Sequence, residues 1–390
     1  MKLFIDLTSL ADHLSGIERY AMNLSLELIK HKEVDFILLF KGQIHPAFKA
    51  YKKADNVTCK VLRTCNKLLF NQIVLPRAVK KMDCDYYFFP AFPNPIFLRK
   101  KNMITTIHDV GCFDCPETMK TLSRIYFQYS YKHSAKSCQF ILTDSEFSMG
   151  RIAERLPKAK GITKLIYDGI EDKMLALGDS ANDDPDGPGE AIKKKSKAEK
   201  IEILEKYKLP ERFILSLSTL EPRKNLSLLV KAYAELIEKK ATDRKLVLAG
   251  RLGWKMEDFL AEFSEDVKKN IVFTGFIDDE DLPALYGMAD LFVFPSKYEG
   301  FGIPPLEALA CGTRVLSSDA ASLPEVLGEA ANYFKSDNVQ DLKEKLQACI
   351  DQREKLDEMN KRKMAGYRQA QKFNWKSSAN QLLELMEENM

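Results

Sequence analysis

The chain alternates short, continuously apolar segments with longer segments whose apolar residues recur at helical spacing. The short segments of the first half have the length and composition of buried β-strands: Leu3–Asp6, Asp35–Phe40, Thr58–Leu62, Tyr86–Phe89, Ile104–Ile107 and Phe140–Thr143. Between the first two, one face of a helix is formed by Ile17, Tyr20, Ala21, Leu24 and Leu28. Because strands and helices alternate, the first half is predicted to form a parallel sheet covered by helices on both sides.

The second half repeats this alternation without any evident sequence repeat. Its predicted strands are Phe213–Leu217, Leu246–Ala249, Ile271–Thr274, Leu291–Phe294 and Arg314–Leu316. Helices are predicted near Leu226–Glu238, Asp281–Ala289 and Pro305–Ala310. The 390 residues therefore divide into two separate α/β domains, in agreement with roughly 150 residues per domain.

The predicted domain boundaries follow from composition. An N-terminal domain is predicted over 1–175 and a C-terminal domain over 203–372. The segment 176–202 between them, rich in Gly, Asp, Pro and Lys, cannot bury a core and is predicted to be a flexible linker. The tail 373–390 is predicted to be a helix that crosses back to the N-terminal domain, since its apolar stripe must dock somewhere.

Charge is distributed unevenly along the chain. The total of 59 Lys and Arg against 56 Asp and Glu gives a net charge of +3, but residues 1–170 carry +10 and the rest −7. The segment Lys41–Lys81 alone carries +9. Such a stretch is either a solvated face or a surface attracted to anionic lipid. Nucleic acid is not expected as a partner, because aromatic residues are sparse there and no recognition motif appears.

The apolar segments also bear on the compartment. Asp6 interrupts the first one too early for a signal peptide, and runs such as Phe36–Phe40 are far shorter than the roughly 20 residues that span a bilayer. We therefore expect a cytoplasmic protein.

The densest chemical motif is Tyr298-Glu-Gly-Phe-Gly-Ile-Pro-Pro-Leu-Glu307, directly after the strand Leu291–Phe294. Its glycines allow a tight turn, and its prolines suit the first positions of a helix. A strand, a glycine loop and a helix N-terminus together predict an anion site. Glu307 is expected in the first helical turn, where it could accept hydrogen bonds from sugar hydroxyls. The alternative is a plain turn with a surface glutamate.

A second motif, Ser216–Asn225, also follows an apolar strand directly. It places Arg223 and Lys224 at the carboxyl end of that strand, the edge of an open α/β sheet where ligands bind. An arginine fork beside a lysine suits a diphosphate, although adjacent cations are more often simply solvated. Two such motifs at two strand ends of one domain favour a binding site.

Together these motifs resemble the retaining GT-B glycosyltransferases, in particular the bacterial mannosyltransferase-like group of glycosyltransferase family 4 (group 1). The resemblance spans nearly the whole chain except Gly178–Lys200. It rests on the E-x7-E spacing of Glu299 and Glu307 and on further matches: Thr219-Leu-Glu-Pro-Arg-Lys-Asn225, Ala289-Asp-Leu-Phe-Val-Phe-Pro-Ser296, Ser15-Gly-Ile-Glu-Arg-Tyr20, Ile107-His-Asp109, Leu142-Thr-Asp-Ser145 and Ala310-Cys-Gly-Thr-Arg-Val315.

The resemblance implies two Rossmann-like, doubly wound parallel-sheet lobes that face each other across a cleft. The C-terminal lobe would bind a nucleotide diphosphate sugar, with GDP-mannose as the expected donor, and the N-terminal lobe the acceptor. The implied reaction transfers a hexose, with retention, to a glycan or lipid-diphosphate-linked acceptor in surface polysaccharide biosynthesis, at the inner face of the cell membrane. The alternatives are a GT-B phosphorylase, a nucleotide-sugar epimerase or a non-catalytic sugar-nucleotide binding protein.

The same resemblance implies roles for individual residues. Arg223 and Lys224 would neutralise the departing diphosphate, and Glu307 would hold the ribose hydroxyls. His108 would sit near the anomeric centre; the alternative is a core histidine bonded to its neighbour. Glu299 would contact the transferred sugar. Backbone contacts to the donor are implied for Gly16, in a loop after the first strand, and for Gly300, Phe301, Gly302 and Ile303.

No cofactor or metal is expected. The eight cysteines contain a single C-x-x-C spacing, Cys112 and Cys115, and no second pair completes a zinc set, so all are taken as thiols. Asp83-Cys-Asp85 is a D-x-D sequence of the kind that binds metal in other glycosyltransferases, but it stands at the polar entry to a predicted strand. By the resemblance, GT-B enzymes generally need no metal.

Overall fold

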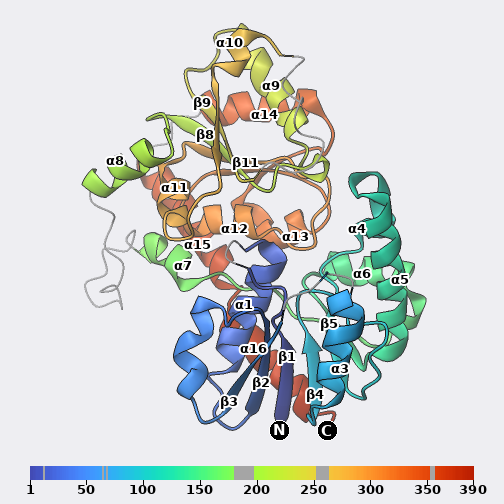
Figure 1. Ribbon diagram of the computed structural model, residues 1–390. Coiled ribbons are helices and arrows are strands. Elements are labelled where there is room, and N and C mark those ends of the chain that lie inside the picture. The colour runs from blue at the N-terminus through green and yellow to red at the C-terminus, as the bar shows by residue number, and fades with distance from the viewer. Residues whose placement is uncertain (12–13, 64–65, 67–68, 180–196, 252–262, 352–355) are drawn as a thin grey trace. The chain divides into compact units, whose positions relative to one another are not determined.

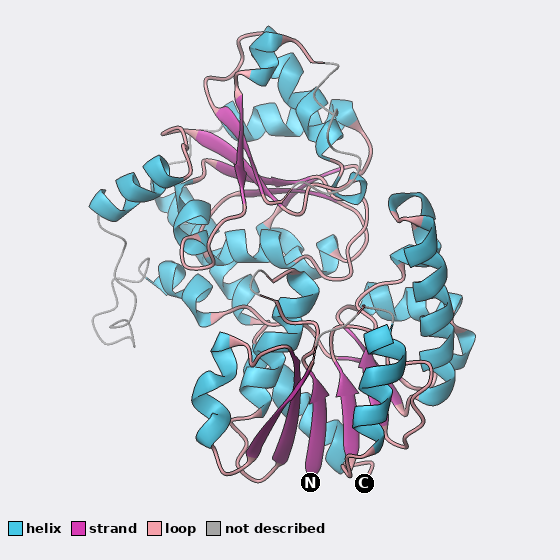
Figure 2. Ribbon diagram, viewed as in Figure 1, coloured by secondary structure: helices cyan, strands magenta, loops and turns pink. Residues whose placement is uncertain are grey.

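The computed structural model describes residues 1–11, 14–63, 66, 69–179, 197–251, 263–351 and 356–390. It divides into two compact units, and each contains one parallel sheet with helices on both of its faces (Figures 1 and 2). The first unit comprises Met1–Gly169 together with Asn374–Met390, and the second comprises Ile170–Phe373. The first unit thus ends six residues before the predicted boundary at 175, and it includes the last helix.

The sheet of the first unit has seven strands in the order β3-β2-β1-β4-β5-β6-β7. Every pairing in it is parallel, as the alternation with helices predicts. The strands are β1 (Lys2–Asp6), β2 (Asp35–Lys41), β3 (Val57–Leu62), β4 (Tyr86–Phe89), β5 (Met103–Thr106), β6 (Phe140–Thr143) and β7 (Thr163–Leu165).

The helices α1 (Gly16–Leu28) and α16 (Trp375–Glu387) bury apolar residues in one core with the strands of this sheet. The helix α1 begins with a capping box in which Ser15 and Glu18 satisfy the first free N–H groups. The helix α16 packs beside α1 in the same apolar core, and the Tyr86 hydroxyl donates to the Met386 carbonyl at 2.8 Å. The helices are α1 (Gly16–Leu28), α3 (Leu75–Lys80), α4 (Gly111–Asp114), α5 (Thr121–Ser137), α6 (Glu146–Arg155) and α16 (Trp375–Glu387).

The sheet of the second unit has six parallel strands in the order β10-β9-β8-β11-β12-β13. They are β8 (Phe213–Leu217), β9 (Lys245–Ala249), β10 (Ile271–Gly275), β11 (Leu291–Phe294), β12 (Val315–Ser318) and β13 (Asn332–Phe334). Its helices are α7 (Asp172–Asp179), α8 (Lys197–Lys206), α9 (Leu226–Glu238), α10 (Glu265–Lys268), α11 (Leu282–Met288), α12 (Ile303–Ala310), α13 (Leu323–Leu327), α14 (Val339–Asp351) and α15 (Leu356–Gln371). Among the described helices of both units, none is long and apolar enough to cross a membrane.

Three strands differ from the sequence-based prediction. The segment Thr58–Leu62 was expected to be buried, but β3 lies at the edge of its sheet and exposes Thr58, Lys60 and Val61. The edge strands β7 and β13 were not predicted. Each has only three residues and is largely unburied, so neither produces an apolar run in the sequence.

The predicted linker 176–202 is shorter than expected. Helix α7 continues to Asp179 and α8 begins at Lys197, because Lys, Glu, Ile and Leu in this second segment favour helix. The rest of the predicted linker, 180–196, lies outside the described residues.

Each sheet has one place at which the direction of strand succession reverses. In the first unit this switch point lies between β1 and β4, and in the second it lies between β8 and β11. The loops that leave two such strands diverge to opposite sides and leave a crevice at the carboxyl edge, where open α/β sheets bind ligands. Both motifs found in the second half of the sequence begin at this edge.

Candidate active site

The candidate active site lies in the second unit, where the loops after β8 and β11 meet. Arg223 and Lys224 belong to a short 3₁₀ turn that ends at Asn225, whose left-handed backbone (φ 53°) redirects the chain into α9. The two loops are joined by a hydrogen bond from the Lys297 N–H to the Arg223 carbonyl at 3.0 Å. Both predicted motifs are therefore brought together at the switch point.

Glu299 is the centre of this site. Its Oε1 atom accepts hydrogen bonds from Lys224 Nζ at 2.6 Å and from Ser296 Oγ at 2.5 Å. Its Oε2 atom lies 3.3 Å from Arg223 Nη1, which also donates to the Tyr298 carbonyl at 2.9 Å. The side chain of Glu299 is 9% exposed and that of Lys224 is 13% exposed, so the ion pairs are shielded from water.

The pKa values of Glu299 and Lys224 reflect the balance between burial and the neighbouring charges. Burial would raise the pKa of Glu299, but Lys224 and Arg223 outweigh it and hold that pKa below its usual value. Burial lowers the pKa of Lys224, and Arg223 adds to this, despite the attraction of Glu299. The three groups carry one net positive charge; Glu221, at the more exposed edge, pairs with Arg223 at 3.3 Å. A bound diphosphate would stabilise the protonated lysine.

The loop that follows β11 is fixed by its backbone. The Ser322 hydroxyl donates to the carbonyls of Glu299 and Phe301, at 3.1 and 2.8 Å. Gly302 has a φ of +112°, and a Cβ there would lie 2.7 Å from the Leu323 side chain, so only glycine fits without strain. This geometry places the amino end of α12, which begins at Ile303, directly after Gly300 and Phe301.

Glu307 lies deeper than the sequence predicts. Because α12 begins at Ile303, Glu307 falls in the second helical turn rather than the first, and it is buried. Its Oε2 atom accepts a hydrogen bond from the Tyr286 hydroxyl at 2.8 Å. The alternative of a surface glutamate is therefore wrong. The hydrogen-bond partner of Glu307, Tyr286 on the separate helix α11, cannot be inferred from the spacing of the motif.

His108 lies in the first unit, just after β5, in a buried polar cluster. Its Nδ1 atom is 2.6 Å from Asp144 Oδ2, and its Nε2 atom is 3.0 Å from the Pro90 carbonyl oxygen. Both partners are acceptors, so the ring satisfies both contacts only as an imidazolium. Burial would lower the pKa of His108, but Asp144, together with the Pro90 carbonyl and Asp109, outweighs it and raises that pKa. This geometry suits a positioning role and not a general base.

Two further groups complete the polar cluster around His108. The Tyr20 ring packs edge-on against the imidazole, with ring centroids 4.7 Å apart, and its hydroxyl accepts a hydrogen bond from Thr106. Burial, together with the nearby charge of Asp144, raises the pKa of Asp168 well above its usual range. Two buried carboxyl groups so close together cannot both be ionised at low cost.

Replacing Asp144 with asparagine should lower the pKa of His108, because the attraction that outweighs burial is removed. In the wild type the raised pKa contributes stability that is fully present below about pH 6.5 and is lost as pH rises through the folded-state pKa. Proton NMR titration of the imidazole signals, assigned with His108→Gln, measures this. His133, whose pKa burial lowers, is the internal control and should titrate unchanged. An unaltered His108 titration in the variant would contradict the assignment.

Other candidate residues of the first unit are placed differently from expectation. Gly16 is the first residue of α1 and not part of a loop. Asp85 of the D-x-D sequence accepts a hydrogen bond from the Lys2 N–H at 2.6 Å. This contact lies at the amino ends of β1 and β4, away from the carboxyl edge where ligands bind. Within the described part of the chain, no three His, Cys, Asp or Glu side chains are grouped as a metal site would require.

The fold and the site together define a class of protein. Two Rossmann-like units, with partly buried cations at the carboxyl edge of the second sheet, match the architecture of GT-B glycosyltransferases, and the predicted fold class of two parallel-sheet α/β units is confirmed. Solved structures with this fold include Anabaena Alr3699/HepE in complex with UDP and glucose, with a TM-score of 0.71 and 17% identity over the whole of both chains. WaaG, a glycosyltransferase involved in lipopolysaccharide biosynthesis, has a TM-score of 0.68 and 15% identity over 99% of both chains.

Sequence relatives give the family. The family described as glycosyl transferases group 1 matches residues 197–365. The chain is 30% identical to O-antigen chain mannosyltransferase B of Escherichia coli over 98% of both chains. It is also 39% identical to the serotype-specific mannosyltransferase WbdA of Escherichia coli, over 48% of this chain and 23% of that protein. This chain belongs to the group 1 glycosyl transferases.

Proposed function

We propose that this glycosyltransferase transfers a mannosyl unit, with retention, from a nucleotide diphosphate sugar to a glycan or lipid-linked acceptor in surface polysaccharide biosynthesis. The observation that carries the proposal is the partly buried cluster of Arg223, Lys224 and Glu299 at the switch point of the second sheet. It combines two cations, suited to a diphosphate, with a carboxylate suited to sugar hydroxyls. The names of the relatives support mannose and a polysaccharide product.

The cluster stabilises the charge that develops when the glycosyl–phosphate bond breaks. Negative charge then accumulates on the diphosphate, while the sugar gains oxocarbenium character. Arg223 and Lys224 are already held in place by Glu299, Ser296 and the Tyr298 carbonyl, so they need little reorganisation at the moment of reaction. Preorganised charge of this kind lowers the barrier to bond cleavage directly.

Glu299 is assigned a binding role and not that of a covalent nucleophile. Its two oxygens are engaged by two cations and a hydroxyl, and its lowered pKa reflects a stabilised, weakly nucleophilic carboxylate. Retention is therefore attributed to attack on the same face as the departing phosphate, which itself accepts the proton of the acceptor hydroxyl. Glu307, buried beside Tyr286, would hold the ribose hydroxyls of the donor.

A thermal-shift screen over nucleotide sugars tests the donor assignment. A ligand that binds only the folded state raises Tm by mass action, and GDP-mannose should give the largest shift. Turnover with an acceptor then identifies the reaction. Formation of a sugar phosphate when inorganic phosphate is supplied as a substrate would show a phosphorylase. Conversion of the nucleotide sugar without any acceptor would show an epimerase. Binding without donor hydrolysis or transfer would leave a non-catalytic protein.

Transfer should survive removal of divalent metal. We expect EDTA to leave turnover within about twofold, because Arg223 and Lys224 supply the positive charge that a metal would otherwise provide. The measurement is product formation in chelator-treated protein with and without added Mg²⁺. Loss of activity that Mg²⁺ restores would overturn the expectation and would direct attention to Asp83 and Asp85.

Peripheral contact with an anionic membrane would suit a lipid-linked acceptor and a cytoplasmic site at the inner face of the cell membrane. We define the α5 surface by its exposed apolar residues Leu122, Ile125 and Tyr129, together with Leu69, Ile73 and Phe97. The Gln72–Tyr126 hydrogen bond at 3.2 Å and the Ile96–Gln72 bond at 3.0 Å join the three segments that carry them. Exposed basic residues lie within four positions of these residues along the chain: Arg77, Arg99, Lys101 and Lys120. Apolar area flanked by cations suits an anionic bilayer surface.

The double variant Leu122→Ser/Ile125→Ser should therefore lose binding to anionic vesicles. Leu122 is 84% exposed and Ile125 is 55% exposed, so the fold does not depend on them. Co-sedimentation with vesicles of phosphatidylglycerol and phosphatidylcholine measures the effect, and pure phosphatidylcholine vesicles should retain little protein. Ile201→Ser, which removes an equally apolar exposed residue (46%) from the second unit, is the matched control. Equal binding to both vesicle types would show that the basic residues near the α5 surface are simply solvated.

A further inference from the structure

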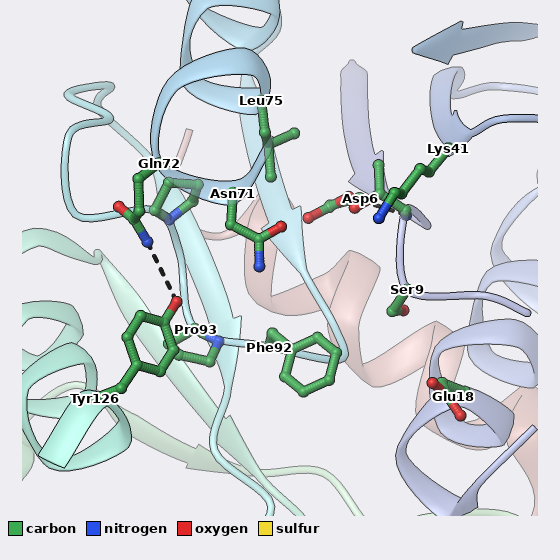
Figure 3. Close-up of a pocket in the computed structure, with 12 residues that line it drawn as sticks. Asp6, Ser9, Glu18, Lys41, Asn71, Gln72, Leu75, Phe92, Pro93 and Tyr126 are labelled. Carbon is green, nitrogen blue, oxygen red and sulfur yellow. Dashed lines mark hydrogen bonds between the residues drawn. The ribbon is translucent and has the colours of Figure 1, made fainter. Parts of the chain in front are cut away.

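Asp168 is a buried titratable residue of the first unit to which the proposed reaction gives no role. It is 4% exposed and follows the end of β7 by three residues. It does not line the cavity of this unit, which has a volume of about 210 Å³ and is bounded by Asp6 and Lys41 among others (Figure 3). Its carboxyl group therefore belongs to the protein interior and not to that cavity.

Two adjacent strands bring Asp168 close to Asp144. The strands β6 and β7 pair in parallel, with Thr143 opposite Leu165, and the Ile166 N–H donates to the Thr143 carbonyl at 3.0 Å. Asp144 directly follows β6, and Asp168 lies two residues beyond Ile166. Asp144 is only 2% exposed. Two carboxyl groups are thus neighbours in the interior, at the carboxyl edge of the sheet.

Aromatic residues pack around these carboxyl groups. The Tyr20 ring on α1 lies edge-on to the His108 ring, with centroids 4.7 Å apart, and edge-on to the Trp375 ring at 5.7 Å. Trp375, at the start of α16, in turn packs on the backbone next to Asp168. A Cβ on Gly169 would lie 2.3 Å from the Trp375 backbone nitrogen, so a larger residue does not fit there. The segment that carries Asp168 is therefore fixed against α16.

The two carboxyl groups share one positive charge. The Nδ1 atom of His108 is 2.6 Å from Asp144 Oδ2, and its Nε2 atom is occupied by the Pro90 carbonyl. The Oδ1 atom of Asp168 is buried and has no hydrogen-bond partner within the described residues. An unpaired carboxylate is costly to bury, and such a group takes up a proton instead. The proton therefore resides on Asp168, while Asp144 stays ionised beside the imidazolium.

The effects on pKa agree with this distribution of charge. Burial, and then the charge of Asp144, raise the pKa of Asp168 well above its usual value. Burial and the same carboxylate also raise the pKa of Tyr20, which stays neutral. Asp109, the other acidic residue that acts on His108, helps to raise the pKa of the imidazole. The charge of Asp168 is the one that this environment suppresses.

We propose that Asp168 is a positioning residue that works as a neutral carboxylic acid. By remaining neutral it leaves the charge of Asp144 to the His108 imidazolium, and this holds the ring in one orientation. An ionised Asp168 would repel Asp144 and compete with it for the ring. The inference rests on the proposed transferase function, in which His108 is expected near the anomeric centre of the donor sugar.

Infrared spectroscopy of the full chain at pH 7.5 measures the protonation state directly. A carboxylic acid has a C=O stretch that a carboxylate lacks, so the difference spectrum between the wild type and Asp168→Asn should contain the band of one acid. Asp35→Asn, which changes an exposed carboxyl group of the same unit, is the matched control and should leave this band in place. A difference spectrum with carboxylate bands alone would overturn the proposal.

The variant Asp144→Asn extends this measurement and serves if Asp168→Asn does not fold. It removes the negative neighbour that raises the pKa of Asp168. During an alkaline titration the acid band should therefore disappear at a lower pH in Asp144→Asn than in the wild type. Disappearance at the same pH in both proteins would contradict the coupling of the two carboxyl groups and with it the proposal.

Thermal unfolding gives a second measurement of the neutral acid. Because the folded-state pKa of Asp168 is raised, its contribution to stability is fully present below the ordinary pKa of 3.8 and is lost as the pH rises through the folded-state pKa. Asp168→Asn has no such loss, so its Tm relative to the wild type should rise by about 3 °C between pH 4 and pH 8. A relative Tm that stays constant or falls would show an ionised, stabilising carboxylate and would refute the neutral acid.

Turnover separates positioning from a merely structural role, when kcat is measured well below the Tm of every variant. Asp168→Ala should lower kcat about tenfold, because the space left beside Asp144 lets its carboxylate turn away from the His108 ring. Affinity for GDP-mannose, measured by calorimetry, should be unchanged, and Asp168→Asn should retain most of the turnover that the alanine variant loses. Wild-type kcat in Asp168→Ala, or equal losses in both variants, would overturn the positioning role. If the wild type transferred no sugar, the proposed function would fail, whereas the infrared band would still identify the neutral acid.

Discussion

Replacing Lys224 with alanine should lower kcat on the order of 10²- to 10³-fold while donor affinity changes much less. The side chain is 13% exposed and touches Glu299 at 2.6 Å, in a shielded site where one charge has a large effect. Burial lowers the pKa of this lysine. Negative charge that develops on the leaving diphosphate would stabilise the ammonium, so the favourable interaction grows as the bond breaks. An interaction that strengthens in the transition state affects kcat more than binding.

Steady-state turnover with the donor and acceptor, together with calorimetry of the nucleotide sugar, separates the two effects. Lys239→Ala is the matched control, because this lysine is 65% exposed in the same unit and far along α9 from the motif. The control should retain kcat within about twofold. A Lys224→Ala enzyme with near-normal kcat and weakened donor binding would assign the lysine to ground-state binding only.

Much of the fold can be predicted from the sequence because buried parallel strands are continuously apolar. Phe213–Leu217, Leu291–Phe294 and Phe140–Thr143 were located to the residue for this reason. The order of the strands in the sheet cannot be predicted in this way. Nothing in the period of Thr58–Leu62 reveals that β3 has a neighbour on one side only, so its exposure could not be predicted.

The candidate site was predictable where its residues are local in sequence. Arg223 and Lys224 stand in one motif and Glu299 in another, and the rule that ligands bind at the carboxyl edge was enough to bring them together. The pairing of His108 with Asp144 was not predictable, because it joins the ends of β5 and β6 and depends on their adjacency in the sheet. Sequence gives Asp144 no signal beyond its position after an apolar strand.

The same limit applies to Asp6. In the sequence it is only the polar residue that ends the first apolar segment, where it argued against a signal peptide. In the structure it stands at the switch point between β1 and β4 and lines a cavity. The burial of Glu307 could not be predicted for a similar reason. The predicted helix started at Pro305, whereas Ile303 and Pro304 already belong to α12, so Glu307 lies one helical turn later than expected. Strand order and helix start, and not residue type, decide both cases.

Replacing Glu299 with alanine should destabilise the second unit by about 3 kcal/mol, as expected when one partner is removed from a buried ion pair. The change leaves Lys224 and Arg223 close together without the carboxylate between them, and it removes the acceptor of the Ser296 hydroxyl. Activity should fall by at least the factor expected for Lys224→Ala, since both cations lose their orientation. Addition of GDP should recover part of the stability, because a diphosphate replaces the missing negative charge.

Urea denaturation followed by circular dichroism measures the stability of this variant, with Glu221→Ala as the matched control. Glu221 contacts the same arginine but is 26% exposed, so its loss should cost less than about 1 kcal/mol. The pKa of Glu299 is lowered from 4.5, so its contribution is fully present above that pH and disappears as the pH falls through the folded-state pKa. The difference between wild type and Glu299→Ala should thus be constant from pH 6 to 8 and shrink in acid. Equal costs for the two glutamates would show that the cluster is held together by its backbone and not by charge.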